Sequence, residues 1–265
     1  MKAPEADLSG WVREPFAAEG FSYDVYRKGS GPGVVLIPEM PGVHPGVLAL
    51  GNHLVDNGFT VAIPSLFGTP GAPARGLGLV PTLIRGCVAK EFAAFALHKE
   101  RPVTRFLRAL ARDLNAKTPG KGVGVIGQCF TGGFALAAAV DDSVLASVLS
   151  QPSVPIALTA AHKRDPGFSE GEMKVIEKRA AEDGLCALGL RFSGDPMAPA
   201  QRFATLKDRL GDNFEVIEID SAPGNAGGFG RAAHSVLTLE VREADGQPAY
   251  EARKRVVEFL KERLA

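Results

Sequence analysis

The residues whose chemistry is easiest to infer surround Cys129. The segment Gly127-Gln-Cys129-Phe-Thr-Gly132-Gly133 follows an apolar run and precedes an alanine-rich helical run. A strand, a tight turn and a helix in this order force the residue at the tip of the turn into a strained conformation above the sheet, and small neighbours make room for it. The pattern predicts Cys129 as a nucleophile at that tip. The alternative is a buried structural cysteine, a common environment for a free thiol.

Two backbone amides are candidates for stabilising negative charge near this thiol. The Phe130 amide lies in the first turn of the expected helix, where it has no intrahelical acceptor and is free to hold an oxyanion. The second donor is expected after the apolar run 33–37, in Pro38-Glu39-Met40-Pro41. Pro41 has no amide hydrogen, so we assign the role to Met40. Glu39 would then lie beside the nucleophile, where its carboxylate could hold or accept the thiol proton; the alternative is an exposed turn glutamate.

A base and an orienting acid are expected later in the chain, in the order nucleophile, acid, base. Asp195 follows a strongly apolar run and begins a loop, and its alternative role is to cap the helix that starts near Pro199. His234 lies in a later loop and is the only histidine after Asp195. The other four histidines are expected at the surface: His44, His53, His98 and His162.

Some remaining arginines and cysteines have less specific surroundings. Four arginines could bind a substrate carboxylate, although most are expected to be surface charges. They are Arg75, Arg85, Arg101 and Arg105. Cys87 and Cys186 have no turn or basic context, so both are expected to be small core residues.

A glycine motif offers a competing function. Gly122, Gly124 and Gly127 match the spacing G-x-G-x-x-G of dinucleotide-binding proteins, and Asp141 follows at a suitable distance. That motif requires a strand before its first glycine and a helix that opens at its third. Here turn residues precede the motif and the apolar strand lies inside it. We therefore expect no NAD site, no other cofactor and no metal.

The elements that must position these residues alternate along the chain, which is typical of an α/β fold with a mostly parallel central sheet and helices on both faces. Strands are expected at 21–26, 33–37, 60–64, 122–127, 145–150, 187–192 and 214–219. Helices are expected at 44–57, 102–115, 132–140, 167–183, 199–210 and 250–264. Residues 1–265 are expected to form one domain, with an irregular, pocket-shaping excursion at about 68–99.

Composition limits the classes of function. The 265 residues are 45% hydrophobic and carry 30 basic and 30 acidic side chains, so no net charge would attract nucleic acid or anionic lipid. Three scattered cysteines suggest a reducing compartment rather than a disulfide framework, and no export signal is visible. Two uncharged stretches, 122–140 and 143–162, contain glycines or prolines and suit a buried core better than a membrane span. We expect a soluble cytoplasmic protein, a monomer or a small homo-oligomer.

Together, these residues resemble the dienelactone hydrolase family of the α/β-hydrolase fold, whose members use a cysteine nucleophile. The resemblance extends from about residue 33 to 264 and depends on the Cys129 turn, the Pro38-Glu39 strand end, Ser193-Gly194-Asp195 and His234. It implies a Cys129–His234–Asp195 triad, with Glu39 engaging the resting thiol. It also implies hydrolysis of lactones or activated esters.

Two departures from the family pattern bear on this expectation. Thr131 replaces a glycine that is usual in the turn, which could alter the turn slightly. Members that act on dienelactone use an arginine shortly after the histidine, whereas here Ser235-Val-Leu-Thr238 follows and the nearest arginine is Arg231. We therefore expect a small carboxylic ester or lactone other than dienelactone. The alternative is a non-catalytic small-molecule binder or thiol redox sensor on the same fold.

Overall fold

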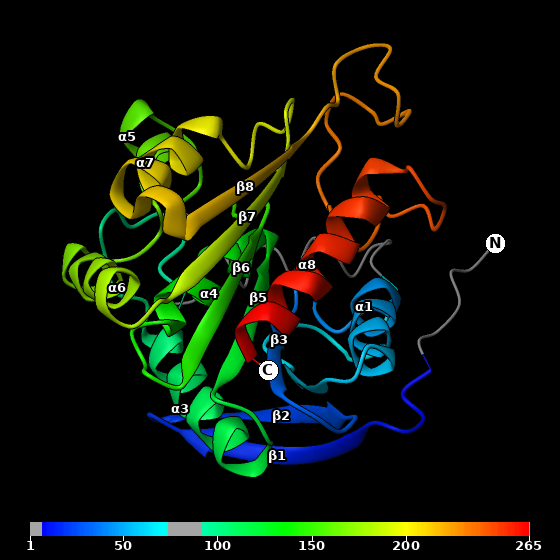
Figure 1. Ribbon diagram of the computed structural model, residues 1–265, viewed down its shortest axis with the longest axis vertical. Coiled ribbons are helices and arrows are strands. Elements are labelled where there is room, and N and C mark those ends of the chain that lie inside the picture. The colour runs from blue at the N-terminus through cyan, green and yellow to red at the C-terminus, as the bar shows by residue number, and fades with distance from the viewer. Residues whose placement is uncertain (1–6, 74–91, 265) are drawn as a thin grey trace.

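The computed structural model describes residues 7–73 and 92–264, and within them an eight-stranded sheet in the order β1-β2-β4-β3-β5-β6-β7-β8 (Figure 1). The first strand pairs antiparallel with the second and the second antiparallel with the fourth, and all other pairings are parallel. The strands are β1 (Val12–Ala18), β2 (Phe21–Lys28), β3 (Gly33–Ile37), β4 (Thr60–Pro64), β5 (Val123–Gln128), β6 (Val144–Ser150), β7 (Cys186–Phe192) and β8 (Phe214–Ile219). The mostly parallel central sheet expected from the sequence is confirmed.

Helices cover both faces of this sheet (Figure 1). They are α1 (Pro45–Asp56), α3 (Pro102–Lys117), α4 (Gly132–Ala138), α5 (Ala160–Arg164), α6 (Glu170–Glu182), α7 (Ala200–Leu210) and α8 (Pro248–Leu264). The apolar side chains of α1 and α8 belong to one buried cluster, and those of α3, α4, α6 and α7 belong to another. The sheet therefore separates two hydrophobic cores.

Strand β3 illustrates why the central strands are continuous apolar runs. Val34 and Leu36 pack into the core with α1 and α8, whereas Val35 and Ile37 pack into the core with α3 and α4. Successive side chains of a strand point to opposite faces, so a strand covered on both faces needs apolar residues at every position. This is the reason that the buried central strands were recognisable. All seven expected strands are present within two residues of their expected limits.

The sequence pattern did not predict β1. This strand lies at the edge of the sheet and most of its side chains are exposed. It also contains Arg13, Glu14 and Pro15, which are residues typical of protected sheet edges. Only Phe16 and Ala18 pack against the core, so no continuous apolar run marks this strand.

Among the helices, the largest difference from expectation is the start of α6. The helix was expected from residue 167 but begins at Glu170, because Ser169 caps it reciprocally with Glu172. Gly167 has a φ of 100°, which is incompatible with a helix. The short α5 was not expected; it has no buried residue and therefore no amphipathic pattern.

The irregular excursion expected at 68–99 is only partly within the described residues. The parts at 68–73 and 92–99 contain no helix or strand. The segment 74–91, with Arg75, Arg85 and Cys87, lies outside the described residues.

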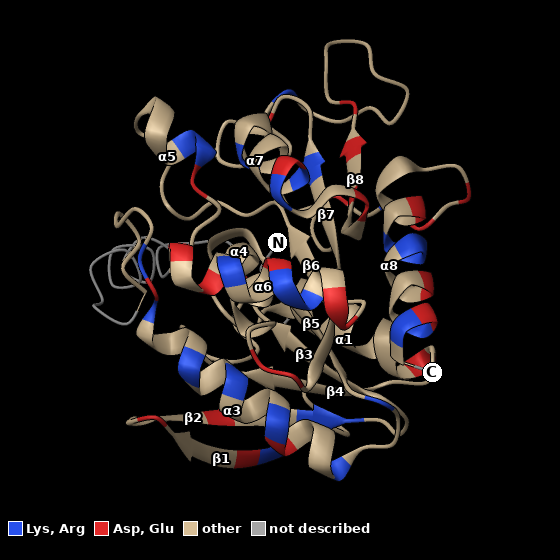
Figure 2. Cartoon of the chain, turned by 60° about the vertical axis from the view of Figure 1, so that its left-hand side comes forward, with Lys and Arg blue, Asp and Glu red and all other residues tan. Residues whose placement is uncertain are grey.

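Charges are mixed over the surface of the described chain. Lys and Arg are interspersed with Asp and Glu on α6 and α8, whereas α3 carries mainly Lys and Arg (Figure 2). Many form ion pairs, such as Lys117 with Asp113 and Arg255 with Glu215. No helix in the described residues is long and apolar enough to span a bilayer.

Candidate active site

Cys129 occupies the sharp turn between β5 and α4. Its φ is 51°, in the left-handed region that non-glycine residues rarely adopt, and residues Cys129–Thr131 form a 3-10 turn. A Cβ on Gly127 would lie 2.3 Å from the Thr131 carbonyl oxygen, and one on Gly132 would lie 2.6 Å from the Cα of Pro152. The two glycines are therefore required by the close approach of backbone on each side of the cysteine.

Thr131, the departure noted in the sequence, is built into this turn. Its hydroxyl accepts a hydrogen bond from the Gln128 amide at 3.1 Å. The same hydroxyl lies within hydrogen-bonding distance of the carbonyl oxygens of Ile37 and Pro38, at 3.3 Å and 3.2 Å. The extra side chain thus links the Cys129 turn to the end of β3 while the turn keeps its strained form.

Asp195 and His234 come together although they lie on different loops. Asp195 is buried at the end of β7, and its Oδ2 is 2.6 Å from Nδ1 of His234. Its Oδ1 accepts a hydrogen bond from the Met197 amide at 2.9 Å. Because the residue that caps α7 is Pro199, Asp195 does not have the capping role that was its alternative.

The other ring nitrogen of His234 faces the thiol. Burial lowers the pKa of His234, but the hydrogen bond to Asp195 and the interactions with Cys129 outweigh burial and raise it to about 10. Nε2 itself is buried and makes no hydrogen bond of normal geometry in the described residues. Catalytic hydrogen bonds are often long or poorly aligned in unliganded sites and shorten when substrate binds. His234 is thus a cation at neutral pH, with Nε2 directed at the thiol of Cys129.

Glu39 is buried beyond the end of β3 and is not an exposed turn residue. Ser235 and Gln151 donate hydrogen bonds to its Oε2 at 2.9 Å and 3.3 Å. Thr238 donates to Oε1, and Nε2 of His44 lies 3.3 Å from the same oxygen. Among the described residues these four side chains are its partners, and Cys129 is not one of them.

The charge of Glu39 is stabilised by these neighbours. Burial raises its pKa, but the hydrogen bonds from His44, Thr238 and Ser235 outweigh burial and lower it. Glu39 is therefore ionised at neutral pH although it is enclosed.

Two expectations about surface residues were wrong. His44 is buried; its Nδ1 accepts the Gly46 amide at the start of α1, and its Nε2 faces Glu39. Arg101 is also buried, because the carbonyl oxygens of Lys99, Gly167 and Ala96 accept its hydrogen bonds. Burial lowers the pKa of Arg101 to about 10.

The remaining expectations about surface and core residues concern Arg105, three histidines and Cys186. Arg105 is exposed and lies 3.6 Å from Glu100. His98 is exposed, whereas His53 and His162 are half-buried. Cys186 is buried, as expected.

The two expected oxyanion donors lie beside the same apolar cluster as the nucleophile. Met40 and Cys129 are half-buried against it, and Phe130 belongs to it. The ring of Phe130 contacts those of Phe67 and Phe92 edge-on, with centroids 5.8 Å and 5.5 Å away. The surroundings of the thiol are therefore apolar on this side.

Sequence reasoning missed two polar residues that follow β6. Ser153 Oγ lies 3.5 Å from the sulfur of Cys129, and the Ser153 amide donates a hydrogen bond to the Cys129 carbonyl. Gln151 has a φ of 34° and bonds Glu39. Both lie just beyond the carboxyl end of a buried parallel strand, where side chains of neighbouring strands converge. Their position after this apolar strand was the sequence signal that could have identified them.

The glycine motif has a packing explanation. Gly124 and Gly127 lie inside β5, and a Cβ on Gly124 would be 2.5 Å from Leu260 on α8. Helix α4 opens only at Gly132, so no helix begins at the third glycine of the motif. Within the described ranges, no group of three or more His, Cys, Asp or Glu residues could hold a metal ion.

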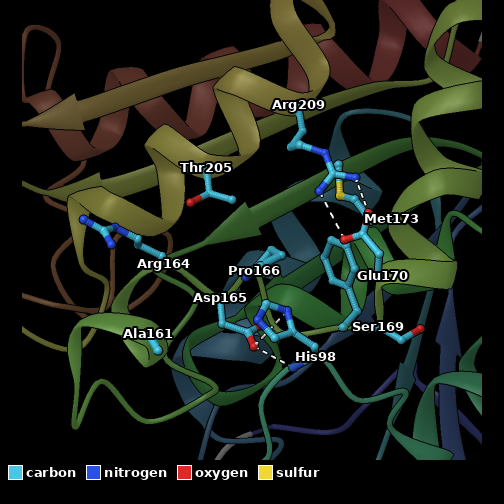
Figure 3. A pocket seen from close by; sticks show the side chains of 11 residues that line it. His98, Ala161, Arg164, Asp165, Pro166, Ser169, Glu170, Met173, Thr205 and Arg209 are labelled. Carbon is cyan, nitrogen blue, oxygen red and sulfur yellow. Dashed lines mark hydrogen bonds and ion pairs between the residues drawn. The ribbon is translucent and has the colours of Figure 1, made fainter.

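A separate cavity of about 310 Å³ lies beside α5, α6 and α7 (Figure 3). Its charged groups are largely paired: Arg209 with Glu170 at 2.7 Å, and His98 with Asp165 at 3.5 Å. None of the residues lining it belongs to the Cys129 site. It holds no nucleophile beside a base, so the Cys129 turn is the stronger candidate for an active site.

Comparisons with known proteins agree with this geometry. Residues 22–264 match the model of the dienelactone hydrolase family. A solved dienelactone hydrolase-like promiscuous phosphotriesterase from metagenomic libraries is 16% identical, with a TM-score of 0.63 over 96% of this chain and 98% of that one. An esterase from Pyrococcus furiosus is 15% identical, with a TM-score of 0.60 over 100% of both chains. No curated protein matches the chain.

Proposed function

Because the chain belongs to the dienelactone hydrolase family, we propose that it hydrolyses a small carboxylic ester or lactone through a Cys129–His234–Asp195 triad. The observation that supports this most strongly is the strained Cys129 facing a histidine that Asp195 holds at 2.6 Å. These residues would supply the nucleophile, the base and the orienting acid that covalent catalysis requires.

The resting site would hold a thiolate and an imidazolium. Asp195 fixes the His234 ring through Nδ1, which leaves Nε2 to exchange a proton with groups above the thiol. The raised pKa of His234 supports the imidazolium of this pair. The nucleophile would therefore need no further deprotonation before it attacks.

In the first half of the reaction, the thiolate attacks the carbonyl carbon and a carbon–sulfur bond forms. The amides of Phe130 and Met40 would hold the oxyanion. When the intermediate collapses, the carbon–oxygen bond breaks and the leaving alkoxide takes the proton from Nε2 of His234. A thioester on Cys129 and a neutral His234 remain.

In the second half, neutral His234 takes a proton from water, and the hydroxide attacks the thioester carbonyl. The carbon–sulfur bond then breaks, the acid product leaves and the thiolate–imidazolium pair is restored. With a lactone, the alkoxide stays attached to the acyl group, so the product is a hydroxy acid.

Two of the four candidate arginines, Arg101 and Arg105, lie within the described residues and bear on the choice of substrate. Arg101 is bonded to backbone carbonyls and Arg105 lies beside Glu100, so neither supplies an unpaired guanidinium next to the thiol. The apolar cluster around Phe130 would favour an uncharged acyl group. We propose a neutral ester or lactone as substrate.

The test is hydrolysis of p-nitrophenyl esters and simple lactones by the wild type and by Cys129→Ala. We expect turnover to fall at least about 1,000-fold in the variant, because the nucleophile is removed. Cys186→Ala, which removes the other described cysteine, is the matched control and should keep wild-type kcat. A phosphotriester belongs in the panel, since one structural relative is described as a phosphotriesterase.

Two results would contradict the proposal. One is wild-type turnover by folded Cys129→Ala. The other is rapid alkylation of Cys129 in the wild type without turnover of any ester, which would favour the binder or redox sensor instead.

A further inference from the structure

Ser153 touches the sulfur of Cys129 and has no assigned role. Its Oγ is 3.5 Å from Sγ, and this is the hydroxyl's only hydrogen-bond partner among the described residues. The residue is half-buried, like Cys129. Its hydroxyl is thus positioned to interact with the nucleophile itself.

The segment that carries Ser153 is fixed on both sides. Before it, Gln151 donates to Glu39 and accepts the Val236 amide at 3.3 Å, which ties the segment to the loop of His234. The buried Arg202 donates to the carbonyl oxygens of Pro152, directly before Ser153, and Pro155, two residues after it. A hydroxyl on a segment held in this way keeps its place near the thiol without a further bond of its own.

The direction of the hydrogen bond follows from the charges around the sulfur. The titratable groups nearby are His234 with Asp195 behind it, and the Glu39–His44 pair at the end of β3. Glu39 is occupied by four other side chains, so Ser153 and His234 are the polar groups that face the sulfur. In the proposed nucleophilic form the sulfur is a thiolate, which can only accept, so the serine hydroxyl donates in that form.

We propose that Ser153 is a catalytic residue that donates a hydrogen bond to the resting thiolate of Cys129 and holds it facing His234. This inference rests on the proposed role of Cys129 as nucleophile. It assigns to Ser153 the contact with the resting sulfur that the family resemblance assigned to Glu39. When the sulfur attacks a carbonyl and loses its charge, the bond weakens and the hydroxyl is released.

The experiment measures alkylation of Cys129 by iodoacetamide against pH, followed at the peptide that contains it. In Ser153→Ala we expect the midpoint of the rate profile to rise by about one pH unit, because the ionised thiol loses a charge-assisted hydrogen bond. Below the midpoint this is about a tenfold slower reaction. Ser153→Thr keeps a hydroxyl and should restore the wild-type midpoint.

Ser143→Ala is the matched control. Ser143 is also half-buried and directly precedes the same strand, β6, but its hydroxyl bonds Asp141. Its loss should leave the alkylation midpoint unchanged. Thermal unfolding of each variant shows whether the fold is intact.

An unchanged midpoint in folded Ser153→Ala would overturn the inference, and so would equal shifts in the Ala and Thr variants. The ester assay separates this failure from failure of the proposed function. A shifted midpoint without any ester hydrolysis would keep the hydrogen bond from Ser153 to Cys129 and reject the hydrolase together with the catalytic role of Ser153. Cys129-dependent ester hydrolysis with an unshifted alkylation midpoint would support the hydrolase and overturn the role of Ser153.

Discussion

Two carboxylates lie beyond the ends of strands on either side of Cys129, and their surroundings differ. Asp195 bonds one ring nitrogen and one backbone amide. Glu39 bonds four side chains from three segments of the chain. A carboxylate that bonds a single titratable ring can orient and stabilise a catalytic base. A carboxylate whose oxygens all accept hydrogen bonds from fixed side chains is suited to holding those side chains in place. We infer that Asp195 serves the reaction and that Glu39 holds the loop of His234 against the sheet.

The largest expected effect that separates the two regions is that of Asp195→Asn on turnover. The amide cannot stabilise the imidazolium and favours the wrong tautomer of His234, so kcat should fall about 1,000-fold or more. The measurement is ester hydrolysis with thermal unfolding as a check on the fold. Asp220→Asn, at an exposed aspartate after β8, is the control and should keep wild-type kcat. A loss below tenfold would remove the distinction between the two carboxylates.

Glu39→Gln should act mainly on stability. The substitution removes a buried charge that His44, Ser235 and Thr238 are arranged to meet, so the free energy of unfolding should fall by about 1–3 kcal/mol. Turnover should fall by less than about tenfold, since Glu39 does not touch the thiol. Denaturant unfolding and ester hydrolysis measure the two effects, with Glu14→Gln on the exposed edge strand β1 as control. A rate loss as large as that of Asp195→Asn would show that Glu39 acts in the chemistry.

The smallest expected effect is the pH dependence of stability, where the two regions should differ in sign. The lowered pKa of Glu39 contributes stability that is present above its ordinary pKa of 4.5 and is lost as the pH falls through the folded-state value. The raised pKa of His234 contributes stability that is present below pH 6.5 and is lost as the pH rises towards about 10.

Unfolding free energies of the wild type, Glu39→Gln and His234→Gln across this pH range measure the difference. The contribution of Glu39 should vanish at acid pH and that of His234 at alkaline pH. Parallel curves for the three proteins would contradict both assignments.

The parts of this site that could be predicted from sequence have local patterns. Cys129 lies among small residues between a strand and a helix, and Asp195 directly follows an apolar strand. The partners of Glu39 could not be predicted in this way, because Ser235 lies 196 positions away. Nothing in the neighbouring residues indicates which distant hydroxyl will meet a given carboxylate.

Buried polar groups were missed for a related reason. The bonds of Arg101 are accepted by backbone carbonyls, which every residue has and no pattern marks. His44 was expected at the surface because it starts a helix, yet that helix start is enclosed by the same cluster as Glu39. The fold was easier to predict, because buried parallel strands are continuous apolar runs. The exposed edge strand β1 has no such run.

Arg202 has a consequence for the motions of this site. Its guanidinium joins four carbonyl oxygens, those of Pro152, Pro155, His162 and Asp165, to helix α7. If one of these segments opened alone, it would leave a buried cation short of acceptors, so partial opening is disfavoured. The segments should therefore exchange their amide hydrogens as one cooperative unit. The amide of Ser153, which bonds the Cys129 carbonyl, would then report on the opening of a helix more than 40 residues further along the chain.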